Sequence, residues 1–111
     1  MDGVNIQQLI QLSQQMQSRM SEMQEQLGRE TMTAASGGGM VEVTVDGQGH
    51  IKGVSIDPAA VDPEEVEMLE DLIVAAASAA QRRSKDRMES EMRRAAGGLP
   101  LPGLGNFLGR P

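Results

Sequence analysis

An apolar stripe at helical spacing runs through residues 5–28. Its members step by three or four residues while glutamine fills much of the remaining surface, a pattern typical of one face of an α-helix; they are Leu9, Leu12, Met16, Met20, Met23 and Leu27. The first three recur after eleven residues, about 3.67 residues per turn, so the stripe stays on one side of a straight helix. The helix is expected to end at Gly28 and to be about 36 Å long. A rod of that length with one apolar side needs a partner.

The pattern changes to a period of two after this helix. Residues 41–46 (VEVTVD) alternate β-branched with polar side chains, and apolar residues continue through 51–56 (IKGVSI), which indicates two strands. The Gly47-Gln48-Gly49 stretch between them predicts a hairpin loop. A weaker strand candidate, RETMTAAS, precedes them and is joined through Gly37-Gly38-Gly39. We therefore expect a three-stranded antiparallel meander over about residues 30–57.

A second long helix is expected after the sheet. Asp57-Pro58 ends the last strand, because proline cannot donate to a ladder hydrogen bond. Asp62, Pro63 and Glu65 suit the N-cap, first and third positions of a capping box, so the helix is expected to begin there. Its AAASAA run permits close approach to another element, and Gly97-Gly98 ends it. Together the elements predict an α+β fold with the order α-β-β-β-α.

One domain of residues 1–98 and a flexible Gly/Pro/Leu-rich tail of residues 99–111 are expected. The single aromatic residue, Phe107, lies in the tail, so the core must be built from aliphatic, methionine and alanine side chains. Such a core is thin for a monomer, which favours an oligomer. The residues expected in the core or in a dimer contact are Leu9, Leu12, Met16, Met20, Met23, Leu27, Val41, Val43, Val45, Leu69, Leu72, Ile73 and Ala76.

Residue types that carry catalytic or metal chemistry are scarce. There is no cysteine, which leaves no disulfide framework and no thiolate metal site. The one histidine, His50, lies beside the hairpin loop, without the partners that a metal site or a catalytic triad needs. The SGGGM stretch lacks the Lys-Ser/Thr of a phosphate-binding loop and is expected to be a tight turn. We therefore expect no enzyme, no metal, no cofactor and no small-molecule substrate.

Charge is unevenly distributed along a chain of formal net charge −6 and pI about 4.7. Acidic residues gather in 57–71, where the dipole at a helix N-terminus favours them. Six of the ten Lys and Arg residues lie in 82–94, where six bases and three acids leave +3. The dipole reaches about one turn and does not explain the bases at 82–87. Two interpretations remain open, a solvated helix face or contact with a polyanion. The candidate phosphate-binding residues are Arg82, Arg83, Lys85, Arg87, Arg93 and Arg94, with Arg19 on the first helix as a lesser candidate.

Several segments in combination resemble the YbaB/EbfC nucleoid-associated proteins over nearly the whole chain. They are LSQQMQSRMSEMQEQL, GGGMVEVTVDGQG, VSIDP, EEVEMLEDLIVAAASAA and GGLPLPGL. The resemblance implies an α-β-β-β-α protomer and a tight, tweezers-like homodimer with protruding long helices. It also implies binding to duplex DNA in the bacterial nucleoid, with bending or bridging of the DNA or an influence on gene expression. It transfers no residue-level DNA contacts, and few bases lie on the first helix of this chain.

The expected function is non-catalytic binding of double-stranded DNA by a cytoplasmic, nucleoid-associated homodimer. Contact is expected mainly with phosphates and with weak sequence preference, because the sequence shows no helix-turn-helix signature and no aromatic platform for base stacking. The alternative is a protein–protein interaction or scaffold dimer that uses its amphipathic helices. No apolar run approaches a membrane span, and the basic stretch lacks the bulky apolar anchors of a peripheral membrane helix, so no membrane partner is expected.

Overall fold

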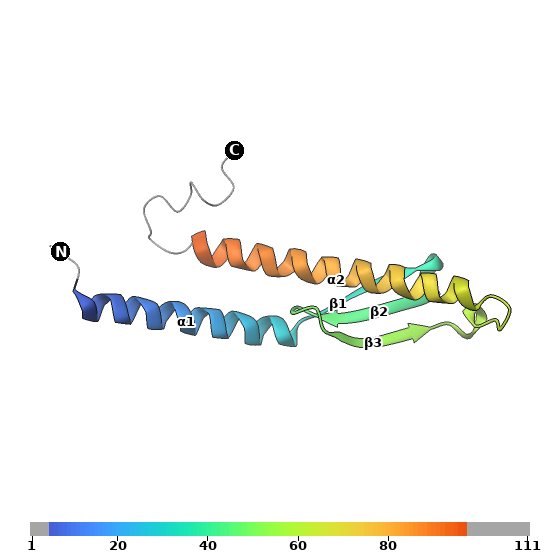
Figure 1. Cartoon of the computed structure of the whole chain (residues 1–111), viewed down its shortest axis with the longest axis horizontal. Coiled ribbons are helices and arrows are strands. Elements are labelled where there is room, and N and C mark those ends of the chain that lie inside the picture. Colours follow the sequence, from blue (N-terminus) through green and yellow to red (C-terminus); the bar gives the residue numbers. More distant parts are fainter. Residues whose placement is uncertain (1–4, 98–111) are drawn as a thin grey trace, which may run out of the picture.

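The computed structural model describes residues 5–97 as a long helix, a small sheet and a second long helix (Figure 1). The elements in chain order are α1 (Ile6–Arg29), β1 (Thr31–Ser36), β2 (Val41–Asp46), β3 (Ile51–Ile56) and α2 (Val66–Gly97), with short 3-10 turns at Gly37–Gly39 and Pro58–Ala60. This order confirms the predicted α+β fold. Gly98 and the tail predicted at 99–111 lie outside the described residues.

Helix α1 projects beyond the sheet and is here called the α1 arm (Figure 1). Asn5 caps it, because the side-chain oxygen of Asn5 accepts a hydrogen bond of 2.7 Å from the backbone N–H of Gln8. Only Met23 and Leu27 of its predicted apolar stripe are buried in the protomer. The stripe therefore contacts the body of the molecule only at the C-terminal end of the helix.

The sheet is an antiparallel meander in the order β1-β2-β3, as predicted. Its register pairs Ala34 with Val43 and Val43 with Val54, so these side chains share one face of the sheet. Helix α2 packs on that face over β1 and β2. The buried cluster between sheet and helix consists of Ala34 and three β2 valines on the sheet, with Ala76 and Ala80 on the helix; the valines are Val41, Val43 and Val45. The small alanines allow the close approach that the sequence predicted.

The turn between β1 and β2 depends on glycine. Gly37 has φ 60°, and a Cβ placed on it would lie 3.0 Å from a methyl carbon of Leu72. The neighbouring Ser36 hydroxyl donates a 2.6 Å hydrogen bond to the Leu72 carbonyl of α2. The predicted tight turn is thus also a contact between the sheet and the helix. Leu72, Leu69 and Ile73 are partly buried against the core, at the edge of the buried set.

The predicted start of the second helix is wrong. The Asp62 carboxylate does accept from the Glu64 N–H at 3.0 Å, as an N-cap would, but the Glu65 N–H closes a turn on the Asp62 carbonyl at 2.9 Å. Helical bonding begins with the Leu69 N–H on the Glu65 carbonyl, and α2 starts at Val66 instead of Pro63. A short Asp side chain stabilises an isolated turn as readily as a helix start, so its local pattern did not separate the two.

Candidate nucleic-acid interface

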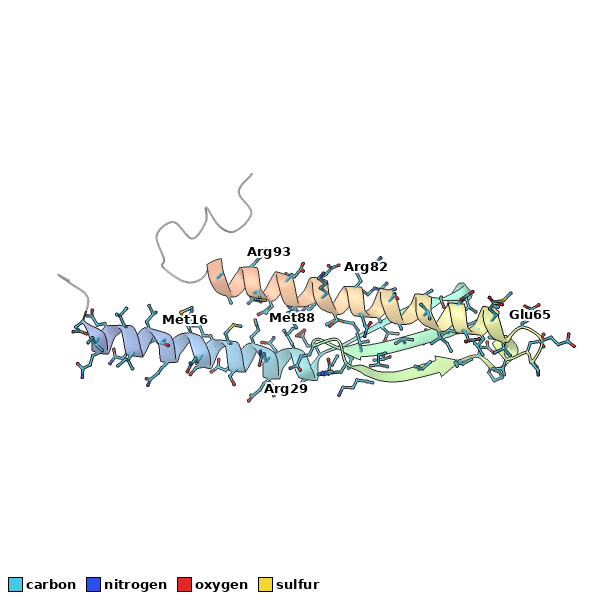
Figure 2. The ribbon with its side chains drawn as sticks, in the orientation of Figure 1. Met16, Arg29, Glu65, Arg82, Met88 and Arg93 are labelled. Atoms are coloured by element: carbon cyan, nitrogen blue, oxygen red, sulfur yellow. The ribbon has the colours of Figure 1, made fainter. Side chains whose placement is uncertain are left out.

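The C-terminal half of α2 carries three exposed cations that turn away from the sheet: Arg82, Lys85 and Arg93, here called the outward cations. Arg82 and Arg93 are eleven residues apart, about three helical turns, and so occupy nearly the same face. Figure 2 shows both along the side of α2 that is turned away from α1. Among residues 5–97, none of the outward cations forms an ion pair.

Arg87 makes its ion pairs within the chain. Its guanidinium makes a two-pronged contact with Glu30, at 3.0 and 3.1 Å, and a third bond of 2.7 Å to Glu91. The hydrogen bonds from Arg87 hold the pKa of Glu91 below its ordinary value, and those to Glu91 and Glu30 raise the pKa of Arg87. Only 30% of the Arg87 side chain is exposed. Arg87 therefore ties α2 to the junction of α1 and β1 and also pairs with Glu91 one turn along α2.

The remaining two bases of this half are partly engaged. The Arg83 guanidinium donates to the Thr33 carbonyl of β1, and Arg94 lies 3.9 Å from Glu91 with 80% of its side chain exposed. Because Arg87 and Glu91 neutralise each other, five bases and two acids, Asp86 and Glu89, are left between positions 82 and 94. The exposed side chains of 82–94 therefore carry the net +3 expected from the sequence, but the Glu30 carboxylate that contacts Arg87 lowers the local net charge to +2.

Arg19 lies on α1 beside the end of α2. It lines a cavity of about 180 Å³ between the two helices together with Met16, Met20, Met92, Ala95 and Ala96. Glutamine and serine dominate the surrounding α1 surface, so Arg19 adds one charge to the basic half of α2 and does not form a second basic patch. Six of the seven predicted phosphate-binding residues thus have exposed side chains, five on the C-terminal half of α2 and Arg19 on the neighbouring part of α1, whereas Arg87 lies between the elements.

The acidic residues lie at the other end of the molecule. The exposed acids of 57–71 occupy the turn before α2 and the first turns of α2, where Figure 2 labels Glu65. The helical stretch between Val66 and Arg93 corresponds to about 40 Å at 1.5 Å per residue. The molecule therefore has an acidic end and, in the C-terminal half of α2 (residues 82–94), a cationic arm.

The structure is an elongated chain whose cations gather on the C-terminal half of α2. Comparison of its sequence with known families shows to which family it belongs. The YbaB/EbfC DNA-binding family matches residues 1–99. The chain belongs to the YbaB/EbfC DNA-binding family. It is 44% identical over 105 residues to a nucleoid-associated protein of Desulfotalea psychrophila, a match that covers 95% of this chain and 99% of the relative. A nucleoid-associated protein of a Thermoanaerobacter species is 43% identical over 102 residues, 92% of each chain.

A solved structure shares the fold of this YbaB/EbfC chain. An uncharacterized protein from Helicobacter pylori superposes with a TM-score of 0.76 over 83% of this chain and 97% of its own, at 23% sequence identity. Within residues 5–97, no helix is long and apolar enough to span a bilayer, and no cluster of three or more His, Asp or Glu side chains could hold a metal ion.

The β2–β3 hairpin attaches the α1 arm to the body of the YbaB/EbfC protomer. The Gly47 N–H donates to the Leu27 carbonyl at 2.8 Å, and the Gln48 side chain donates to the Gln24 carbonyl at 2.6 Å. The hairpin is itself held by Asp46, whose buried carboxylate accepts from the backbone N–H groups of Gln48 and His50 at 2.8 and 3.0 Å. Burial opposes ionisation of Asp46, but these hydrogen bonds outweigh it and lower its pKa to about 2. His50 contacts the same carboxylate, which gives the lone histidine a structural role.

The apolar face of β3 is a second surface that the predicted core list left out. Val54 pairs with Val43 and Ile51 with Val45, so both face the same side as the core, yet 48% and 52% of these residues are exposed because α2 covers only β1 and β2. A β-bulge near Thr44 brings Ile51 and Val54, three residues apart, to one face. The recurrence of apolar residues within 51–56 was the available signal. Only the strand order of the folded sheet shows that β3 is an edge strand that α2 does not cover.

Proposed function

We propose that this protein is a nucleoid-associated protein that binds duplex DNA through the phosphate backbone, with weak sequence preference and without a catalytic step. The observation that carries the proposal is the set of outward cations on α2, which are exposed and free of acidic partners in the described chain although the protein has a net charge of −6. Membership of a DNA-binding family and the names of its relatives support it.

The outward cations suit phosphates better than bases. Arg82 and Arg93 are separated by about 16 Å along a rigid helix, which exceeds the roughly 12 Å width of the DNA major groove. Such a span can reach phosphates of both strands that border the groove. Phosphate contacts position a protein on DNA without carrying sequence information, so the expected sequence preference is weak.

We further propose that the protein acts as a homodimer through the β3 surface. The open edge of β3 and its apolar Ile51 and Val54 are the features that a partner strand or sheet would cover. Pairing two copies doubles the cations and holds two cationic arms at a fixed distance. Two fixed arms on one duplex would bend it, and two arms on separate duplexes would bridge them, which is the basis for the proposed association with the nucleoid in the cytoplasm.

The test is duplex-DNA binding across a salt series with two variants of equal charge. Arg82→Ala removes one outward cation; Arg29→Ala removes one exposed base elsewhere, and Lys52 is left in place because its ammonium lies 3.6 Å from the Asp46 carboxylate. Because each phosphate contact contributes about 0.9 to the slope of log affinity against log salt, the first variant should lose about 0.9 of slope per protomer and the second should lose little. Equal losses in both variants would refute the proposed interface.

Protein binding is the second candidate function, and the exposed stripe of α1 is the observation that favours it. An apolar protein interface responds little to salt, whereas phosphate binding weakens steeply as salt rises. If this protein shows no affinity for duplex DNA even at low salt, that result would support the alternative and exclude the DNA-binding proposal.

A further inference from the structure

The N-terminal two thirds of α1 present an apolar groove that residues 5–97 leave open except beside Met16 and Met20, where the end of α2 approaches it. Leu9, Leu12, Met16 and Met20 are between 37% and 48% exposed. Together with serine and glutamine side chains, they line a hollow of about 510 Å³ that contains no charged residue. The groove is therefore neutral and suits an apolar partner that carries no acid.

Helix α2 leads the chain directly to this groove. It runs antiparallel to α1 (Figure 1), and its last turns contact α1 near Met16 and Met20, where Met92, Ala95 and Ala96 complete the smaller cavity between the helices. Helix α2 thus ends beside the groove. From Met20 to Leu9 the stripe extends about 16 Å, at 1.5 Å per residue.

The sequence after α2 has the length and pattern to cover that distance. Leu101, Leu104 and Phe107 recur at every third residue, and residues 98–111 contain no acid and a single base. A polyproline II helix has three residues per turn, so it would place these three side chains on one side and spread them over about 19 Å. Pro100 and Pro102 favour this conformation, and a preformed extended segment loses less entropy on docking.

We infer that the segment after α2 docks on α1 of its own chain in an extended conformation, with Leu101, Leu104 and Phe107 on the stripe formed by Met20, Met16, Leu12 and Leu9. Gly97-Gly98 allows the chain to turn where α2 ends. The docked segment closes the apolar side of the arm and holds α1 beside α2. The flexible tail expected from composition would then be ordered by this contact. This inference does not depend on DNA binding.

Paramagnetic broadening of methionine methyl signals tests the contact in the full chain. The protein has no cysteine, so Asn106→Cys gives a single attachment site for a nitroxide label next to Phe107. With ¹³C-methyl methionine, docking predicts the loss of the Met16 and Met20 signals. Met68, which is exposed near the acidic end of α2, should keep its signal. Retention of the Met16 and Met20 signals would overturn the inference.

Two further samples identify what holds the segment and to which chain it belongs. Leu101→Ser, Leu104→Ser and Phe107→Ser together should restore the Met16 and Met20 signals, whereas the control Leu99→Ser with Leu108→Ser, on a different side of the extended segment, should leave them broadened. Dilution of the labelled chain into a large excess of unlabelled wild type should not restore them. Recovery on dilution would assign the groove to a second copy, and equal behaviour of the two serine variants would exclude the proposed face; either result overturns the inference.

Discussion

Substitution of Gly47 by alanine should detach the α1 arm from the body of the protomer. A Cβ on this residue would lie 2.4 Å from the Leu27 carbonyl oxygen and 2.9 Å from the Leu27 Cα, distances at which backbone must move. Overpacking of a close contact costs about 1–3 kcal/mol. Moving the hairpin away also breaks the hydrogen bond from the Gly47 N–H to the Leu27 carbonyl, worth about 0.5–1.5 kcal/mol. The expected loss is therefore about 1.5–4.5 kcal/mol.

Gly53 provides the matched control for this experiment. It lies in β3, where a Cβ placed on it would meet no atom within 4 Å, and its φ is not positive, so Gly53→Ala should change the free energy of unfolding by about 0.5 kcal/mol or less. Urea unfolding of both variants gives the difference, and amide hydrogen exchange should show faster exchange near Leu27 in Gly47→Ala. Equal unfolding free energies for the two variants would refute the argument that the hairpin contact fixes the arm.

Three further predictions concern the internal ion pairs, the hairpin carboxylate and the β3 surface. Arg87→Gln should lower the melting temperature and speed hydrogen exchange near Glu30, while DNA affinity at a temperature where the protein is folded stays within about twofold. The Asp46 contribution to stability should be complete above pH of about 4 and lost as pH falls toward about 2, because the unfolded carboxyl binds a proton first; Asp46→Asn should remove this part of the acid dependence in urea titrations. Val54→Asp should shift sedimentation toward the monomer, and an unchanged dimer would place the interface elsewhere.

The sequence predicted the fold well because each element has its own local signal. The stripe of α1 has a period near 3.6, β2 alternates valine with polar residues, and glycines occupy both turns, at 37–39 and at 47 and 49. The prediction of where α2 starts was wrong because an Asp followed by Pro suits a turn as well as an N-cap. Burial of only part of the α1 stripe also escaped prediction, since periodicity shows which side of a helix is apolar but not how far its neighbours extend.

The candidate site was predicted less completely for a physical reason. Arg87 pairs with Glu30, 57 residues away in the sequence, and no local pattern indicates that contact. The Arg83 guanidinium likewise donates to a backbone carbonyl of β1, and a backbone acceptor cannot be recognised from the residue types in a sequence. A cluster of bases on one helix therefore indicates where positive charge gathers, while the packing of that helix decides which of them remain available to a ligand.

Separation of charge explains how a protein of net charge −6 can present a binding surface for a polyanion. Exposed charges farther apart than the Debye length, about 10 Å at 0.1 M salt, barely influence each other. The acids around Glu65 are about 40 Å of helix from Arg93, so a phosphate at the proposed interface would experience the local net charge of +2 and not the total charge. The same acids disfavour an approach of DNA to their own end of the molecule. Charge segregation along one rigid helix would therefore both permit the proposed binding and set its direction.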